Sequence, residues 1–333
     1  DSKFESLRAV KMDLTGVLTN TVYCGLFLVA LIAFALFWGQ EKLLFIPTLD
    51  FKTKTPADNP KGFRTPREQD MDYEDIYLFT KDGVRIHAWF IKQEKPAEHP
   101  TLVYFHANAG NMGFRMPFLK DLHENLKVNI IILSYRGYGY SSGKPSETGL
   151  YEDARCLFEH IESRNDIDLT RIFIFGRSLG GAMSIFSART LEFNRIKLRG
   201  IILENTFTSI PDMVDALFSK IAFLKGLVLR LNFPSIDRIR GLRYPILFIA
   251  GDNDEIVPHA QMKQLYKTAE NLVASKLWVV PGGMHNDTYY KQPNKYLEEV
   301  DTFIKECLQR DFIKPGWIET EAPTSVQEKK DLQ

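Results

Sequence analysis

A serine between two glycines lies at the centre of the segment RIFIFGRSLGGAMSIF, residues 171–186. Gly176, Ser178 and Gly180 fit the pattern Gly-x-Ser-x-Gly, which is a modest signal when it stands alone. Here an apolar strand-like run precedes the pattern and a helix-like segment follows it. A strained turn between a strand and a helix lifts a serine hydroxyl above a sheet and exposes it. Ser178 is therefore the predicted nucleophile.

A serine hydroxyl becomes reactive when a base removes its proton, and histidine is the usual base. In a sheet that carries such a turn, the chain order is serine, acid, histidine. Of the seven histidines, only His259 and His285 follow every candidate acid. His259 opens a predicted helix, where it faces solvent or caps the helix. His285 lies in the turn-rich loop PGGMHNDT after the last strand-like run, so it is the predicted base.

The acid that orients the histidine is expected at the carboxyl end of a nearby strand. The segment LFIAGDNDEIVP places Asp252 and Asp254 directly after such a strand. We favour Asp254, because the chain must turn before a carboxylate can face the histidine. Glu204, at the end of IILEN, is the second choice. Acids at strand ends often do no more than cap the next helix, but here nucleophile, acid and base follow three strands in the expected order.

Oxyanion stabilisation requires backbone N–H groups that point at the developing negative charge. The helix that begins after Ser178 offers its free N–H groups. A second donor is expected from the loop after an early strand, here YFHANAGN, residues 104–111, whose small residues allow a sharp turn. His106 precedes the serine and ends a strand, so we expect it to be a structural hydrogen-bonding residue beneath this loop.

Short apolar runs alternate with amphipathic segments from residue 73 onward, and this pattern is typical of a parallel sheet covered by helices on both faces. An Asp-Gly turn, residues 82–83, predicts an antiparallel hairpin before the parallel strands, which gives about eight strands in all. Residues 206–240 lack strand character and are expected to form a small helical cap. The expected strands after the hairpin are 101–106, 128–135, 171–176, 198–205, 244–251 and 276–282, and the expected helices are 114–126, 148–164, 179–193, 258–272 and 294–309.

The N-terminal region contains Val22–Trp38, a run of 17 residues without a charge. As a helix it spans roughly 26 Å, and Val17–Thr21 extends it toward the ~30 Å core of a bilayer. A helix packed on the domain would normally show a polar face, and this run has none. A signal peptide would be cleaved near Ala33–Ala35, but the apolar run continues past these residues. We expect an uncleaved single-span anchor in lipid, in an endomembrane or mitochondrial membrane. Lys and Arg flank both sides equally, so they give no orientation.

Composition argues against several other functional classes. The 333 residues hold 42 Lys and Arg and 42 Asp and Glu, so nothing favours a nucleic-acid partner. Cys24, Cys156 and Cys307 lie far apart and indicate neither a disulfide framework nor a zinc site. The run GYGYSSG is one residue too long for a dinucleotide-binding fingerprint. No metal and no cofactor are expected.

The segments EKLLFIP, YFHANAGNMGFR, SYRGYGYSSGKPSETGL, ENTFTSIPDM, GDNDEIVP and GGMHNDTY together resemble serine hydrolases of the α/β-hydrolase superfamily. Within it, the chain is similar to the Bem46-like group, which includes the relatives of α/β-hydrolase domain-containing protein 13. The resemblance implies a membrane-anchored hydrolase whose triad is Ser178, Asp254 and His285. It also implies an oxyanion hole formed by the N–H groups of Leu179 and Asn108. The expected organisation is an N-terminal flank (1–16), a transmembrane anchor (17–39), a connector (40–70), an α/β-hydrolase domain (71–313) and a C-terminal tail (314–333).

One position departs from the family pattern: Ala107 stands where relatives usually have glycine. If this position requires a positive φ, alanine strains it by about 1–2 kcal/mol and displaces the Asn108 N–H.

The sequence is compatible with two functions. The first is a membrane serine hydrolase that cleaves an acyl ester or thioester of a lipid or protein. The second is a weakly active or inactive accessory subunit of a membrane complex. The chain begins with Asp1, which fits a removed presequence and an incomplete sequence equally well.

Overall fold

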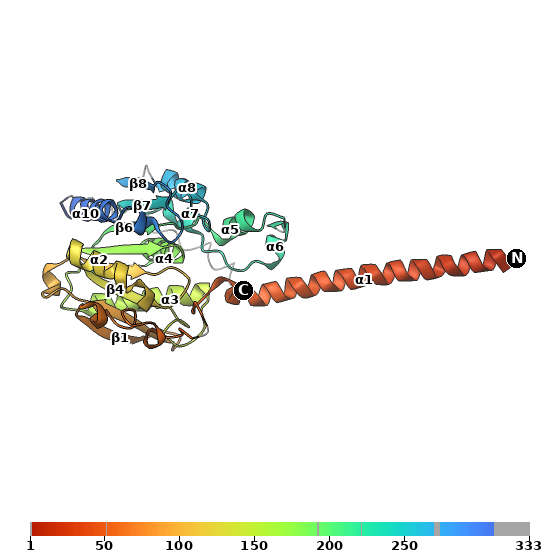
Figure 1. The fold of residues 1–333 in the computed structure, drawn as a ribbon, viewed down its shortest axis with the longest axis horizontal. Coiled ribbons are helices and arrows are strands. Elements are labelled where there is room, and N and C mark those ends of the chain that lie inside the picture. The colour runs from red at the N-terminus through yellow and green to blue at the C-terminus, as the bar shows by residue number, and fades with distance from the viewer. Residues whose placement is uncertain (1, 51, 192, 221, 270–273, 310–333) are drawn as a thin grey trace.

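The computed structural model describes residues 2–50, 52–191, 193–220, 222–269 and 274–309. A sheet of eight strands in the order β1-β2-β4-β3-β5-β6-β7-β8 forms the centre of the described chain (Figure 1). β1 pairs with β2, and β2 with β4, in antiparallel fashion, and every later neighbour is parallel. The mostly parallel eight-stranded sheet predicted from the sequence is thus confirmed. The strands are β1 (Tyr73–Phe79), β2 (Arg85–Ile91), β3 (Thr101–Phe105), β4 (Asn129–Ser134), β5 (Ile172–Arg177), β6 (Leu198–Glu204), β7 (Ile246–Gly251) and β8 (Ser275–Val280).

The strands form where the sequence carries continuous apolar runs, because both faces of the parallel part are covered. Every residue of β3, β4 and β7 is buried. The hairpin between β1 and β2 turns at Gly83, whose φ of +78° is one that L side chains rarely adopt. The predicted Asp-Gly hairpin is therefore confirmed at the position where the sequence placed it.

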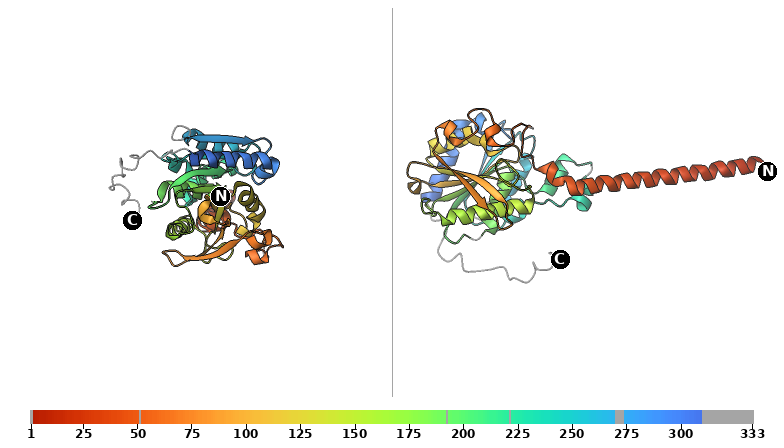
Figure 2. Two further views of the ribbon diagram at one scale, coloured as in Figure 1. Left: turned by 90° about the vertical axis from the view of Figure 1, so that its left-hand side faces the viewer. Right: turned by 90° about the horizontal axis from the view of Figure 1, so that it is seen from below.

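Two hydrophobic cores lie on opposite faces of the sheet, and each is closed by its own helices. One core takes apolar residues from α3, α4, α7 and α8, and the other takes them from α2 and α10. Figure 2 shows the helices on the two sides of the twisted strands. These helices are α2 (Met116–Leu126), α3 (Glu147–Ser163), α4 (Leu179–Thr190), α7 (Ser235–Ile239), α8 (His259–Ala269) and α10 (Pro293–Gln309).

The predicted helical cap is present between β6 and β7. It consists of α5 (Ile210–Leu217), the short η5 (Ala222–Leu224) and α6 (Lys225–Val228), with α7 leading back to the sheet. In Figure 1, α5 and α6 lie on the side of the domain from which the N-terminal helix leaves. The remaining short elements are η1 (Pro56–Asp58), η2 (Pro66–Gln69), η3 (Pro96–Glu98), η4 (Met112–Arg115) and α9 (Thr288–Lys291).

The N-terminal helix α1 (Ser2–Leu44) projects from the domain as a single long rod (Figures 1 and 2). Its segment Gly16–Leu44 is long and apolar enough to cross a membrane, and none of its most apolar window is buried against the protein. The helix runs five residues past the predicted end of the anchor at residue 39, so the first residues assigned to the connector are helical.

Several other boundaries differ from those predicted. α4 ends at Thr190 rather than at residue 193, because the chain leaves the helix at Leu191 with an extended backbone. The proline-rich connector contains the two short 3-10 helices η1 and η2, each of which begins at a proline. Proline fixes the φ angle that a first helical turn requires, and the sequence analysis overlooked this signal. Residues 270–272 of the predicted helix 258–272, and the predicted tail 314–333, lie outside the described residues.

Candidate active site

Ser178 occupies the turn between β5 and α4, with φ of 54° and ψ of −119°. Residues other than glycine rarely adopt a positive φ, so this backbone is strained in the manner expected of a nucleophile elbow. The flanking glycines are needed for steric reasons. A Cβ on Gly176 would lie 2.0 Å from the carbonyl oxygen of Gly180, and a Cβ on Gly180 would lie 1.9 Å from that of Phe105. The predicted strand-turn-helix context is confirmed.

The neighbouring strand β6 holds this turn in place. The Ser178 N–H donates to the Glu204 carbonyl at 2.9 Å, and the Thr206 hydroxyl donates to the Ser178 carbonyl at 2.7 Å. Gly181 allows this approach, because a Cβ there would lie 2.4 Å from the Thr206 Cβ. The serine itself is only 8% exposed. These bonds hold it at the carboxyl edge of the sheet, where the loops after β3, β6, β7 and β8 also meet.

His285 and Asp254 are brought together by the loops after β8 and β7. The Asp254 carboxylate lies 2.8 and 3.0 Å from His285 Nδ1, and both side chains are nearly inaccessible. Asp254 Oδ1 also accepts the N–H groups of Ile256 (2.9 Å) and Val257 (2.8 Å), which fix the carboxylate. A carboxylate at Nδ1 requires a proton on that nitrogen and leaves Nε2 available as the basic atom.

The alternative acids are engaged elsewhere. Asp252 Oδ1 accepts the N–H of Gly282 at 2.7 Å, which stabilises the turn after β8. Glu204 is buried and accepts hydrogen bonds from the Thr288 hydroxyl and, at 2.9 Å, from the Tyr296 hydroxyl. His259 opens α8. Among the described residues, Asp254 is the acid candidate that contacts the His285 imidazole.

Two residues that the sequence analysis did not select connect the elbow to the histidine loop. Arg177 Nη2 donates to the His285 carbonyl at 2.6 Å, and Asn205 Nδ2 donates to the same oxygen at 3.1 Å. Burial opposes the charge on Arg177, but the Glu204 carboxylate 3.9 Å from its Nε raises the pKa of the guanidinium above its ordinary value. Arg177 directly follows the predicted strand 171–176 and Asn205 ends the predicted strand 198–205, and these positions were the signal that could have identified them.

Ser178 and His285 lie in the loops after β5 and β8, at the same edge of the sheet, and in the described part of the chain no direct hydrogen bond joins the Ser178 hydroxyl to the His285 imidazole. Catalytic hydrogen bonds are often long or poorly aligned in ligand-free forms and tighten when substrate binds. The serine therefore has its position fixed by the backbone, and the histidine by the carboxylate.

The oxyanion loop after β3 contacts the end of α1. The side-chain oxygen of Asn108 accepts the Tyr138 hydroxyl at 2.8 Å and the Ile46 N–H at 3.4 Å, and its amide donates to the Leu44 carbonyl. In addition, the Gly110 N–H donates to the Ile46 carbonyl at 2.9 Å. The segment that leaves α1 therefore holds the loop expected to supply the second oxyanion donor.

Ala107 is free of the strain that its substitution for glycine could have caused. It does not occur among the described non-glycine residues with positive φ, so its methyl group meets no backbone penalty. His106, directly before it, is fully buried, and its Nδ1 lies 2.7 Å from the Ala107 carbonyl. Burial, together with the nearby Arg115, lowers the pKa of His106 to about 3. A neutral imidazole that donates from Nδ1 fits the predicted structural role.

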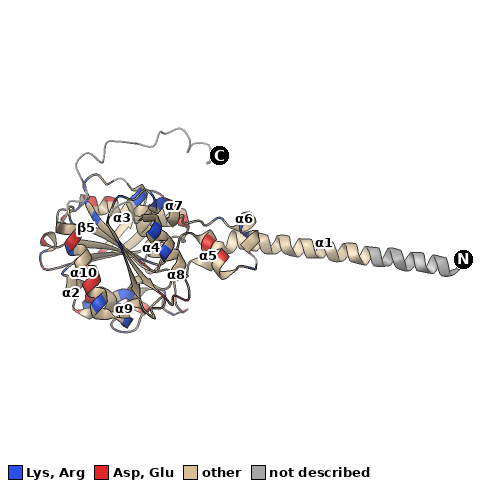
Figure 3. Cartoon of the chain, turned by 90° about the horizontal axis from the view of Figure 1, so that it is seen from above, with Lys and Arg blue, Asp and Glu red and all other residues tan. Residues whose placement is uncertain are grey.

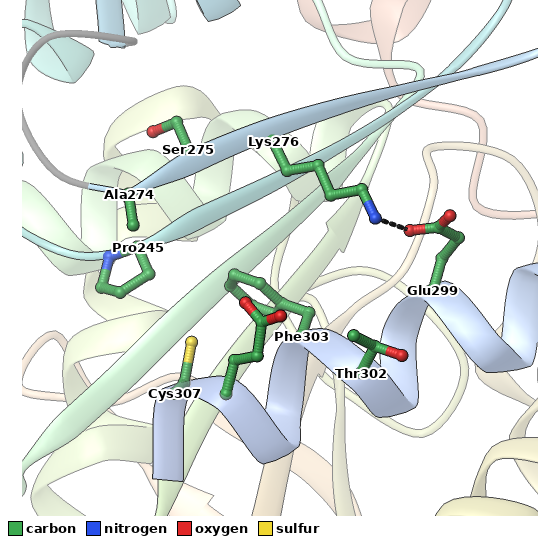
Figure 4. A pocket seen from close by; sticks show the side chains of 9 residues that line it. Pro245, Ala274, Ser275, Lys276, Glu299, Thr302, Phe303 and Cys307 are labelled. Atoms are coloured by element: carbon green, nitrogen blue, oxygen red, sulfur yellow. Dashed lines mark hydrogen bonds and ion pairs between the residues drawn. The ribbon is translucent and has the colours of Figure 1, made fainter. Parts of the chain in front are cut away.

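A separate cavity of about 150 Å³ lies at the opposite end of β7 and β8 from Asp254 (Figure 4). The Lys276–Glu299 ion pair crosses its rim, and Phe303 and Cys307 of α10 form part of its wall. None of the predicted site residues lines it. The chemistry is therefore expected at the other edge of the sheet.

Several known proteins are similar to this chain over most of its length. The family model of serine aminopeptidase S33 hydrolases matches residues 97–237. The α/β-hydrolase domain-containing protein WAV2 of Arabidopsis thaliana is 39% identical, over 78% of this chain and 88% of its own length. Protein bem46 of Schizosaccharomyces pombe is 37% identical, over 84% and 90%. This chain belongs to the Bem46-like group of the α/β-hydrolase superfamily. An uncharacterized membrane protein of Saccharomyces cerevisiae is a further relative, 33% identical over 75% and 84%.

Solved structures extend the likeness to the fold of this Bem46-like chain. The esterase Pf2001 of Pyrococcus furiosus superposes with a TM-score of 0.60, covering 73% of this chain and 93% of its own at 19% identity. At that identity the likeness concerns the fold alone. The α/β-hydrolase fold expected from the sequence is confirmed, and with it membership of a hydrolase family.

Proposed function

We propose that this Bem46-like chain is a membrane-anchored serine hydrolase that cleaves an acyl ester or thioester through an acyl-enzyme. Ser178 attacks the acyl carbonyl while His285 Nε2 takes its proton, and Asp254 holds the imidazole in the required tautomer. The protonated imidazole then gives its proton to the departing alcohol or thiol. Water, activated by the same histidine, attacks the acyl-enzyme, releases the acid and restores Ser178.

The observation that carries this proposal is the pair of short contacts between Asp254 and His285 Nδ1, at 2.8 and 3.0 Å, next to a strained serine turn. The oxyanion of the tetrahedral intermediate would be bound by the N–H groups of Leu179 and Asn108. The first of these begins α4, where helix N–H groups lack intrahelical partners and the helix dipole favours negative charge.

Membrane anchoring enters the proposal through α1, whose apolar segment Gly16–Leu44 matches a bilayer in length. The similarity to the yeast membrane protein points in the same direction. An anchored enzyme acts most readily on acyl groups held at the bilayer. We therefore expect long-chain lipids or acylated proteins to be better substrates than short, soluble esters.

A fluorophosphonate probe tests the nucleophile on the full chain in detergent. The wild-type protein is expected to be labelled and Ser178→Ala to be unlabelled. Ser187→Ala is the matched control, because this buried serine lies on the same helix and donates to the Met183 carbonyl at 2.8 Å. Folded wild-type protein that takes up no label would overturn the proposal and favour the accessory-subunit function.

The ester and thioester alternatives are distinguished by comparing kcat/KM for an oxygen ester and a sulfur ester that carry the same acyl chain. Oxygen and sulfur esters of acetate, octanoate and palmitate form a suitable set in mixed micelles. We expect kcat/KM to rise with chain length in at least one series, and the faster series assigns the leaving group. A preference for acetate in both series would contradict the long-chain assignment while leaving the serine mechanism intact.

A further inference from the structure

The cap carries an apolar surface that the protein leaves uncovered. Leu217, Phe218, Phe223 and Leu227, all within residues 217–228, are 50%, 55%, 80% and 71% exposed. We call these four residues the cap patch. Isolated apolar residues on a surface are ordinary, but four large ones within twelve residues form the kind of patch that marks an interaction site.

The cap is fixed against the last turns of α1. Gln40 is the main link: its amide donates to the Val228 carbonyl at 3.1 Å, and its oxygen accepts the N–H groups of Arg230 (2.7 Å) and Leu231 (3.0 Å). Arg230 adds a second link, with its guanidinium 4.9 Å from the ring of Phe37 and its Nε 3.0 Å from the Phe37 carbonyl. Figure 3 shows α5 and α6 beside the domain end of α1. These contacts therefore fix the position of the cap along the axis of α1.

This attachment lies where α1 would leave the hydrocarbon. Residues 16–40 contain no charged side chain, and Figure 3 shows the described projecting part of α1 without red or blue. In the sequence, charges begin again at Glu41 and Lys42. Trp38, 63% exposed, is of the type that collects at the membrane–water interface. The elements that carry the cap patch thus lie beside the domain end of α1, close to where the uncharged part of this helix ends. Lys225 and Arg230, on or beside α6, form ion pairs with Asp215 and Glu41.

We propose that the cap patch inserts into the leaflet from which α1 emerges, as a second and shallow membrane contact. This inference rests on the proposed membrane anchoring of α1. The partner is the lipid bilayer. The patch is carried next to the exposed apolar segment of α1, and an apolar surface of that length is stable in hydrocarbon rather than in water. A short amphipathic element of this kind buries its apolar side about 5–10 Å into the boundary between headgroups and acyl chains.

Insertion of the cap gives the active site an entrance from the membrane. α5 begins at Ile210, four residues after Thr206, whose hydroxyl is bonded to the Ser178 carbonyl. On the other side, the oxyanion loop touches Leu44 and Ile46 at the end of α1. The predicted nucleophile therefore lies behind the cap on the edge of the sheet that faces the bilayer.

Fluorescence quenching in lipid vesicles tests the insertion on the full chain. An environment-sensitive NBD label is attached at Phe223→Cys, in a background where Cys24, Cys156 and Cys307 are replaced by alanine. The vesicles are phosphatidylcholine with or without doxyl groups on the acyl chains. We expect a blue-shifted emission and at least a two-fold stronger quenching than for a label at Glu306→Cys. Glu306 lies on the exposed side of α10, which Figure 1 shows on the side of the domain away from α1.

A third label, at Leu28→Cys in the middle of the apolar part of α1, separates the two ways in which the experiment can fail. Quenching at Leu28 without quenching at Phe223 would overturn cap insertion and leave the anchor in place. No quenching at either position would overturn the anchoring itself, and the cap proposal with it. A blue shift at Phe223 that depends on protein concentration and not on doxyl lipid would assign the patch to a second copy of the chain, which also overturns the proposal.

Discussion

The carbonyl of Leu44, the last residue of α1, accepts a hydrogen bond from the side-chain amide of Asn108, in the loop that is expected to bind the oxyanion. The same side chain accepts bonds from the Ile46 N–H and the Tyr138 hydroxyl. One amide thus joins the end of α1, the loop after β3 and the loop after β4. The geometry of the proposed oxyanion site depends on the segment that leaves α1.

Replacing this amide is expected to slow catalysis through loss of position. Asn108→Ala keeps the backbone N–H but removes three hydrogen bonds, so we expect kcat to fall about 10- to 100-fold, less than the loss expected when a donor is removed outright. Tyr138→Phe removes one of the three bonds and should give a smaller decrease. Steady-state kinetics with an activated ester measure both. Equal activity of Asn108→Ala and wild type would show that the loop needs no support from α1.

The contacts of Asp254 predict which carboxylate orients the histidine. Asp254→Asn keeps an oxygen for the N–H groups of Ile256 and Val257 but no longer favours the correct imidazole tautomer. Loss of kcat by about 10,000-fold is expected, with little change in melting temperature. The matched control is Asp252→Asn, whose carboxylate instead accepts the Gly282 N–H, and it should retain most of the activity. The reverse ranking would exchange the roles of the two acids.

The sequence predicted the parts of the site that follow from chain order and local pattern. Ser178, His285 and the candidate acids each lie at or shortly after the end of a strand, and parallel strands bring their carboxyl ends to one edge, so these candidates could be named without coordinates. The choice among Asp254, Asp252 and Glu204 needed the fold. It depends on which way a carboxylate turns within a loop, and Glu204 turns to the hydroxyls of Thr288 and Tyr296.

Other features could not be predicted because they join segments far apart in the sequence. Gln40 bonds to Val228 and Arg230 nearly 190 residues later, and Asn108 bonds to Leu44. No local pattern marks either contact. The expected strain at Ala107 could not be judged from the sequence for the same reason. The φ angle of Ala107 depends on the path of the whole loop around His106. Boundaries were missed where a backbone preference competes with apolar periodicity, as at the prolines of η1 and η2.

Alanine substitution of a glycine beside Ser178 is expected to destabilise the protein far more than alanine substitution of a glycine in the cap. Gly180→Ala places a methyl group 1.9 Å from the Phe105 carbonyl, so the elbow must move. A decrease of about 1–3 kcal/mol or more in unfolding free energy is expected, together with loss of probe labelling. Gly226→Ala in α6 has open space around the new Cβ and should be neutral or stabilising by up to about 1 kcal/mol. Denaturation in detergent and probe labelling measure both effects, and a mild Gly180→Ala would contradict the tight elbow.

The buried His106 predicts a dependence of stability on pH. Burial, with Arg115 nearby, lowers its pKa from 6.5 to about 3, so between these values the unfolded chain binds a proton that the folded chain does not. The stability contributed by the neutral imidazole is fully present above pH 6.5 and is lost as the pH falls toward 3, by at most about 1.4 kcal/mol per pH unit.

His106→Asn tests this dependence, because the asparagine amide can replace the donor to the Ala107 carbonyl but does not titrate. Chemical denaturation in detergent at several values between pH 7.5 and 4.5 should show that the variant loses less stability on acidification than the wild type. His99→Asn, at a more exposed histidine that contacts the Lys127 carbonyl, controls for the loss of one imidazole and should follow the wild type more closely. Parallel pH curves for His106→Asn and the wild type would mean that His106 becomes protonated in the folded protein as readily as in the unfolded chain. In that case the histidine beneath the proposed oxyanion loop gains a charge in the folded protein as the pH falls. Activity measured over the same pH range should then decrease on acidification.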